Sequence, residues 1–106
     1  MVVDATISFD RVGTDLTVTI VGELDVASAP EFSEQISSAT RPDDWTLWLD
    51  LSAVPFCASA GVSLIARAER EANERGGRMI LLRPSDPVVR ILEQCNLAGQ
   101  LKIRDA

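Results

Sequence analysis

The sequence predicts an α/β fold, with a mixed sheet of four or five strands packed against three or four helices. Three observations support this prediction. Apolar and polar residues alternate near the N-terminus, three later segments carry apolar residues at helical spacing, and residues 79–82 are uniformly apolar. Period two indicates strands, a period near 3.6 indicates helices, and a short apolar run suits a buried central strand. With 106 residues, the chain is expected to form one domain, residues 1–106.

Two strands are predicted at the N-terminus, joined by a turn at Gly13. Their inward positions are Ala5, Ile7 and Phe9, then Leu16, Val18 and Ile20. The short link between them makes the pair an antiparallel hairpin. Further strands are expected over residues 45–51 and 78–83, with a short edge strand over 101–103.

Three helices are predicted between the later strands. A capping box beginning at Ser28 starts the first, residues 59–75 form the second, and Asp86 caps the third. Their buried stripes are Ala29, Phe32, Ile36 and Ala39; Gly61, Leu64, Ile65, Ala68 and Ala72; and Val88, Ile91, Leu92 and Cys95. Helices between strands imply parallel pairing through right-handed crossovers.

Charge and composition exclude several classes of function. Ten Lys and Arg residues against 16 Asp and Glu residues give a net charge of −6, which argues against nucleic acid and anionic membranes as partners. The absence of histidine removes the usual general base and a common zinc ligand, so we expect no enzyme, metal or cofactor. No signal peptide and no run of about 20 apolar residues is present, which predicts a cytoplasmic protein.

The two cysteines, Cys57 and Cys95, are too few for a disulfide framework. A redox pair is one interpretation of them. The predicted topology opposes it, since Cys57 lies at the C-terminal end of the strands and Cys95 ends a helix that runs the other way. Their Cα atoms should exceed the separation of about 7 Å that a disulfide allows. We expect free thiols, with Cys95 in the core.

The C-terminal ends of the parallel strands are predicted to carry the functional surface. The loops over residues 22–27, 55–59 and 84–86 meet there, so Asp25, Ser28 and Ser59 should share one surface. Ser59 starts a helix and projects about 160° from the centre of its buried stripe, so its hydroxyl should be exposed. Two roles are open for that hydroxyl: an N-cap, or an acceptor of a phosphoryl group at the positive end of a helix.

Two segments resemble the STAS family of sulphate-transporter and anti-sigma-factor-antagonist domains. The sequence GELDVASAP, residues 22–30, is similar to the strand-to-helix loop of that family. The sequence LDLSAVPFCASAGV, residues 49–62, resembles its phosphorylation segment, and residues 78–97 fit its final strand and helix. The resemblance covers nearly the whole chain and implies a stand-alone STAS-like domain.

The resemblance implies an anti-sigma factor antagonist. In that branch the motif is commonly Asp-Ser-Ser-Gly, and its first serine, which matches Ser59, is phosphorylated by an anti-sigma factor that is also a serine kinase. The unphosphorylated antagonist binds the anti-sigma factor and frees the sigma factor. Phosphorylation adds a charge of about −1.5 to −2 and ends binding, and a serine phosphatase resets the protein. Gly61 matches the motif, whereas Ala58 and Ala60 replace the Asp and the second Ser.

The same resemblance implies a partner-binding surface around Ser59. Its expected members are Asp25, Ser28, Ala58, Ala60, Gly61, Val62 and Ser63. Asp25 has a second interpretation, as the turn-forming residue of an Asx-type loop, and Ser63 as a solvated helix serine. The missing Asp at position 58 leaves an alternative function open: a STAS module that acts by binding alone, in a signalling scaffold or a transporter-associated complex.

Overall fold

The computed structural model of the chain describes residues 5–105, which form one mixed sheet packed against helices. The strands are β1 (Thr6–Val12), β2 (Asp15–Val21), β3 (Thr46–Ala53), β4 (Arg78–Leu82) and β5 (Lys102–Arg104). The helices are α1 (Ser28–Ala39), α2 (Ser59–Glu74), α3 (Asp86–Gln94) and the short 3-10 helix η1 (Ala98–Gln100). The strand order is β1-β2-β3-β4-β5, with β1 antiparallel to β2 and all other neighbours parallel. The predicted mixed α/β fold is confirmed.

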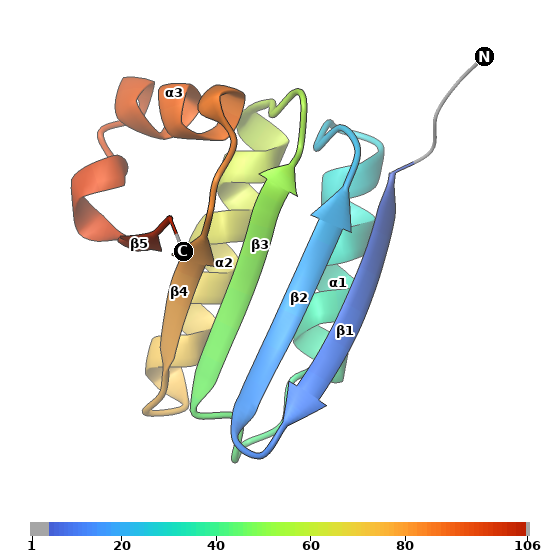
Figure 1. Cartoon of the computed structure of the whole chain (residues 1–106), viewed down its shortest axis with the longest axis vertical. Helices are drawn as coiled ribbons and strands as arrows, with labels where there is room; N and C mark the ends of the chain where they lie inside the picture. Colours follow the sequence, from blue (N-terminus) through green and yellow to red (C-terminus); the bar gives the residue numbers. More distant parts are fainter. Residues whose placement is uncertain (1–4, 106) are drawn as a thin grey trace.

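Helices α1 and α2 lie side by side on one face of the sheet (Figure 1). The strand residues that point toward them are fully or almost fully buried: Leu16, Val18, Ile20, Leu47, Leu49, Leu51, Met79 and Leu81. The predicted helical stripes supply the other side of this core, including Phe32, Ile36, Leu64, Ile65, Ala68 and Ala72. No helix of residues 5–105 covers the opposite face of the sheet (Figure 1).

Helix α3 closes the core at the C-terminal end of β4 (Figure 1). Its buried residues are Val88 and Leu92, whereas Ile91 is only partly buried. The prediction that Cys95 belongs to the core is wrong, because α3 ends at Gln94 and the C-cap Cys95 is exposed. Both thiols are free, as predicted.

Strand β1 is an edge strand, and its inward residues are less buried than those of β2. Phe9 points to the α1 side of the sheet but remains 39% exposed in a shallow groove beside that helix. Two inter-element ion pairs support the helical face. Arg11 of β1 bonds Asp44 before β3, and Arg67 of α2 bonds Glu34 of α1.

Candidate functional site

Three loops lie together at the C-terminal ends of β2, β3 and β4, as predicted. The backbone of Leu24 forms an isolated parallel bridge with Cys57, with the Leu24 amide bonded to the Phe56 carbonyl at 2.9 Å and the Ala58 amide to the Leu24 carbonyl at 2.8 Å. The Ser85 amide donates to the Leu51 carbonyl at 3.2 Å, which ties the third loop to β3. The surface above these bonds is therefore fixed by backbone pairing.

Ser59 is the first residue of α2 and is exposed, as predicted. The N-cap is Ala58, with extended backbone (φ −90°, ψ 177°), and no side chain caps this helix. The capping interpretation of Ser59 is therefore wrong, because the chain enters the helix one residue earlier. The Ser59 hydroxyl makes no hydrogen bond to any residue in the described range. The first amides of a helix lack intrahelical acceptors, so a free hydroxyl lies at its positive end.

Asp25 shapes the neighbouring loop. Its Oδ1 atom accepts hydrogen bonds from the amides of Ala27 at 3.0 Å and Ser28 at 2.9 Å, and its carbonyl accepts from Ala29 at 3.0 Å. The amide bonds to the carboxylate, first that from Ser28 and then that from Ala27, hold the pKa of the Asp25 carboxyl below its usual range. The Asx-type interpretation is confirmed: Asp25 is an ionised carboxylate at the N-terminal end of α1.

The predicted capping box at Ser28 is wrong. The Ser28 side chain makes no cap hydrogen bond, and its hydroxyl instead donates to the Glu23 carbonyl at 2.7 Å and accepts from the Asp25 amide at 3.1 Å. Asp25 reaches the amides at the start of α1 because the chain already turns into helical geometry at Ala27. Ser28 thus lies beside Asp25, but its hydroxyl is occupied within the loop.

Gly61 and Val62 do not belong to the exposed surface, which corrects their expected place in it. Gly61 is buried, and a Cβ atom on it would lie 2.5 Å from the Cys57 sulfur and 3.0 Å from the Leu24 Cβ. Val62 is 8% exposed. The first turn of α2 packs closely on Leu24 and Cys57, and only a glycine permits this approach. Both residues therefore support the surface from below.

The remaining predicted residues are accessible. Ala58 and Ala60 are partly exposed, and Ser63 is exposed, with its hydroxyl donating to the Ser59 carbonyl at 3.3 Å. Ala60 and Ser63 line a groove of about 410 Å³ between the first halves of α1 and α2, together with Ala29, Pro30, Leu64 and Arg67. Ser59 precedes Ala60 in the chain but does not itself line this groove.

Two exposed apolar side chains in the loops were missed by the sequence analysis. Val26 is 78% exposed and follows Asp25, and Phe56 is 49% exposed and precedes Cys57. Phe56 also lines a second hollow with Pro87, Arg90 and Ile91 of α3. A usable signal existed, since both residues are large, apolar and outside every strand or helix stripe. Exposed apolar groups near one another are typical of protein-binding surfaces.

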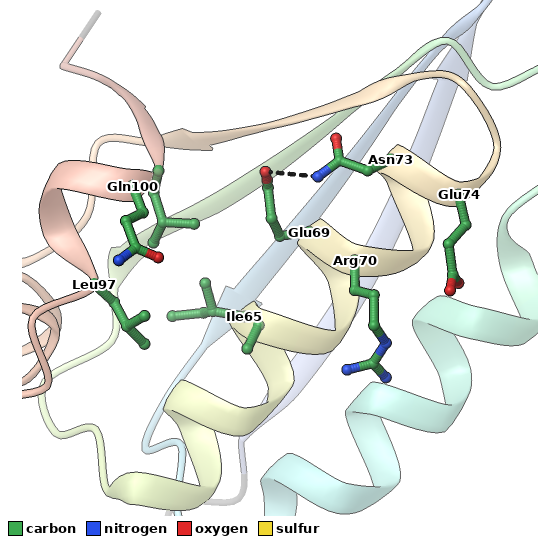
Figure 2. Close-up of a pocket in the computed structure, with 9 residues that line it drawn as sticks. Ile65, Glu69, Arg70, Asn73, Glu74, Leu97 and Gln100 are labelled. Carbon is green, nitrogen blue, oxygen red and sulfur yellow. Dashed lines mark hydrogen bonds between the residues drawn. The ribbon is translucent and has the colours of Figure 1, made fainter.

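A further groove, of about 620 Å³, lies away from these loops, between α2 and the segment around η1 (Figure 2). Ile65 and Leu97 form its apolar side, and Glu69 accepts a 3.1 Å hydrogen bond from Asn73 at its edge. Among its polar lining residues, Glu69 and Asn73 are the one hydrogen-bonded pair in the described part of the chain. No group of three or more candidate metal ligands occurs within residues 5–105. Nor does any helix in that range have the length and hydropathy of a membrane span.

Comparison with known proteins places the chain in a family. Over 90 residues it is 23% identical to an anti-sigma-B factor antagonist of Listeria monocytogenes, covering 85% of this chain and 79% of the relative. The solved anti-sigma factor antagonist of Mycobacterium paratuberculosis superposes with a TM-score of 0.82 at 21% identity, covering 97% of this chain and 87% of that one.

The anti-sigma factor antagonist SpoIIAA is similar in two solved forms. The unphosphorylated form gives a TM-score of 0.78 at 24% identity, covering 94% of this chain and 89% of that one. The phosphorylated form, from Bacillus, gives 0.74 at 22% identity, covering 94% and 92%. The STAS domain model matches residues 6–106, and the protein therefore belongs to the STAS domain family.

Proposed function

We propose that this protein is an anti-sigma factor antagonist whose control point is Ser59. In its unphosphorylated form it binds an anti-sigma factor that is also a serine kinase, and so releases a sigma factor in the cytoplasm. Phosphorylation of Ser59 ends the binding, and a serine phosphatase restores it. The observation that carries this proposal is the exposed Ser59 hydroxyl, free of other bonds at the start of α2. The names of the Listeria relative and of SpoIIAA support it.

The surroundings of Ser59 explain how a phosphate would end binding. The exposed side chains of Val26 and Phe56 and the groove beside Ala60 are largely apolar, so a bound partner would remove water from them. A phosphoserine adds a charge of about −1.5 to −2, and burying that charge without a matching cation is strongly unfavourable. The same modification is compatible with the free protein, because anions are stabilised at a helix N-terminus.

The charge of the chain supports a protein partner with a basic surface. The net charge is −6, and Asp25 contributes an ionised carboxylate near the start of the neighbouring helix. Such a charge opposes nucleic acid and anionic membranes as partners. We assign the partner contact to Ser59, Ala58, Ala60 and Ser63, to the loop containing Asp25 and Ser28, and to the exposed Val26 and Phe56. The antagonist itself acts as a kinase substrate and not as an enzyme.

A second candidate is a STAS module that binds a partner without being phosphorylated. Ala58 favours it, because this position carries no carboxylate that could contact the kinase or orient the acceptor. Asp25 in the adjacent loop is an ionised carboxylate, but its Oδ1 atom already accepts hydrogen bonds from two amides of its own loop. This oxygen is therefore not free to take the place of a carboxylate at position 58.

Intact-mass measurement after incubation with a cognate kinase, ATP and magnesium separates the two candidates. Phosphorylation adds about 80 Da, and we expect this increase in the wild type and not in Ser59→Ala. Ser63→Ala is the matched control, since Ser63 is an exposed serine one turn further along the same helix.

Calorimetric titration with the anti-sigma factor then tests the switch. Ser59→Ala should bind like the unphosphorylated wild type and should resist inactivation by the kinase. Phosphorylated wild type should bind much more weakly. Equal affinities for the Ser59→Ala variant and the phosphorylated protein would contradict the switch and favour the module that only binds.

A further inference from the structure

One face of the sheet has no helix over it, although four of its five strands are parallel. Within residues 5–105, α1 and α2 both lie on the other face (Figure 1). Parallel sheets occur almost always with both faces covered. The uncovered face is also not purely polar: Val21 is 48% exposed and Val12 is 70% exposed on it. An additional protein layer is therefore expected there.

The strand register places charges of opposite sign on the two sides of β3 in two rows of this face. One row runs Asp10, Thr17, Trp48, Ile80 and Lys102 from β1 to β5. The next row runs Asp15, Thr46 and Arg78 from β2 to β4. In these two rows the acidic residue lies on one side of the central strand β3 and the basic residue lies at the matching distance on the other side. A third row, Thr19, Asp50, Leu82 and Arg104, departs from this pattern. Its charged groups are engaged within the chain, because Asp50 pairs with Arg83 and the Arg104 guanidinium lies over the Trp48 ring.

These charged residues have no ionic partner among the described residues. The salt bridges of residues 5–105 join Arg11 to Asp44, Arg67 to Glu34 and Glu71, and Arg83 to Asp50, and none of them uses the four row residues. Among the described residues, the Arg78 side chain makes only a 3.3 Å hydrogen bond to the Thr46 hydroxyl in the same row. Their charges are therefore available to a neighbouring molecule.

We propose that this face binds a second copy of the same chain, with a twofold axis running along β3. Rotation about that axis lays β1 of one copy over β5 of the other, and β2 over β4. Asp10 then faces Lys102 of the second copy, and Asp15 faces Arg78. An interface of this kind is isologous, so each pair occurs twice. Opposite charges placed in this way fix the register of the two sheets.

Trp48 occupies the centre of the proposed interface. It is partly buried on β3, with the Arg104 guanidinium 5.6 Å from its ring centroid, and its row neighbour Ile80 is only 1% exposed. On the axis, each Trp48 meets the Trp48 of the other copy. Tryptophan is enriched among the residues that dominate binding energy, and sheets that pack face to face lie about 10 Å apart, a distance that these side chains span.

The size of the face indicates which class of interface the dimer would form. Five strands spaced about 4.8 Å apart, with lengths from about 10 Å for β5 to about 26 Å for β3, give a face of roughly 500 Å² on each copy. A standard stable interface buries about 800 Å² on each partner. At roughly 1,000 Å² in total the interface falls in the size class of weak complexes, so the dimer should be weak. The face lies away from Ser59, so dimerisation should not depend on the phosphorylation state, and the two proposals can fail independently.

Sedimentation equilibrium of the full chain from about 5 μM to 1 mM tests the proposal over the concentrations at which a weak dimer forms. Asp10→Lys places like charges against Lys102 and should weaken the dimer at least about tenfold. Lys102→Asp should do the same by opposing Asp10. The double variant Asp10→Lys with Lys102→Asp restores opposite charges across the interface and should recover a Kd within about threefold of the wild type.

Glu31→Lys is the matched control for Asp10→Lys. It makes the same change in net charge at an exposed position of α1, on the other side of the sheet, and should leave the Kd unchanged. Urea denaturation confirms that each variant is folded. A wild type that stays monomeric at about 1 mM overturns the proposal. So do single charge reversals that leave the dimer intact, or a double variant that fails to recover it.

Discussion

The Ala58 amide donates a 2.8 Å hydrogen bond to the Leu24 carbonyl. Asp25 directly follows Leu24 and Ser59 directly follows Ala58, so this bond holds the two loops of the candidate surface in register. Leu24 itself is completely buried, and Gly61 packs against it from the first turn of α2. The position of Ser59 is therefore set by the core below it and not by a flexible loop.

We expect Gly61→Ala to destabilise the protein by about 1–3 kcal/mol, because overpacking a close contact has a cost of that size. The added Cβ would lie 2.5 Å from the Cys57 sulfur. In an uncrowded helix the same change stabilises by about 1 kcal/mol, so even the sign of the effect is informative. The measurement is the free energy of unfolding from urea denaturation.

Cys57→Ala supplies the control for this crowding. Removing the sulfur should relieve most of the penalty, so Gly61→Ala should destabilise Cys57→Ala protein less than wild type. The Leu24 Cβ would still lie 3.0 Å from the added Cβ, so part of the destabilisation should remain in the Cys57→Ala background. Equal penalties in both backgrounds would show that the close approach to Cys57 does not limit position 61.

Asp25→Ala should lower the urea midpoint, because the amides of Ala27 and Ser28 lose their acceptor. Asp25→Asn should retain most of the stability, since an amide oxygen can accept the same bonds. Comparing the two variants separates the contribution of the hydrogen bonds to the loop amides from that of the negative charge of Asp25. If Asp25→Asn keeps stability but loses affinity for the anti-sigma factor, the negative charge acts at the partner surface.

The sequence predicted the sheet and the helices well because burial repeats with period two in strands and near 3.6 in helices. Leu16, Val18 and Ile20 are buried as that alternation requires. The prediction of the helix caps was wrong where two neighbouring residues could both cap the same helix. Asp25 and Ser28 are both good capping residues, and only the three-dimensional turn at Ala27 decides between them.

The candidate surface was predicted in part. Ser59 was placed correctly, since the helical wheel and the family motif agree on it. For Gly61 the two disagree: the wheel puts it on the buried stripe and the motif puts it near the partner, and burial proved correct. Cys95 continues an apolar stripe beyond the end of α3. The residue that marks this end is Asn96, which follows the C-cap Cys95 with a positive φ of 58°.

Stability should fall in acid through Asp44. Its side chain is 1% exposed, and hydrogen bonds from Arg11 and from the Arg41 amide hold the pKa of its carboxyl below the usual range. A folded pKa below the unfolded value means that this stabilisation is complete above about pH 4 and is lost as the pH falls further. Asp44→Asn should lose about 2 kcal/mol at pH 7 and much less near pH 2, measured by urea denaturation at each pH. The same loss at both values would show that the charge of Asp44 does not matter.

The two thiols should differ sharply in reactivity. Cys95 is exposed, whereas Cys57 is 6% exposed and burial raises the pKa of its thiol. Because the thiolate is the reactive form, a thiol reagent should label one cysteine of the native protein quickly and the second only on unfolding. Cys95→Ser should abolish the fast reaction. Fast labelling of Cys95→Ser protein would mean that the first turn of α2 opens readily.

Charge at Ser59 should change the stability of the free protein and its affinity for the anti-sigma factor in opposite directions. Ser59 is the first residue of α2, and its hydroxyl contributes no cap, so Ser59→Ala should alter stability by less than about 0.5 kcal/mol. Ser59→Asp should stabilise by about 0.3–1 kcal/mol, and Ser59→Lys should destabilise by about as much, through interaction with the helix dipole.

Under the proposed function, Ser59→Asp nevertheless binds the anti-sigma factor more weakly than Ser59→Ala, because its carboxylate imitates part of the phosphate charge. Ser63→Asp is the control for the effect on stability, since it adds the same charge one turn later, where the dipole effect is weak. It is no control for affinity, because Ser63 belongs to the proposed partner contact. Thermal unfolding and calorimetric titration of the same samples test both parts. A Ser59→Asp variant that loses stability together with affinity would attribute the switch to unfolding of α2 and not to charge at the interface.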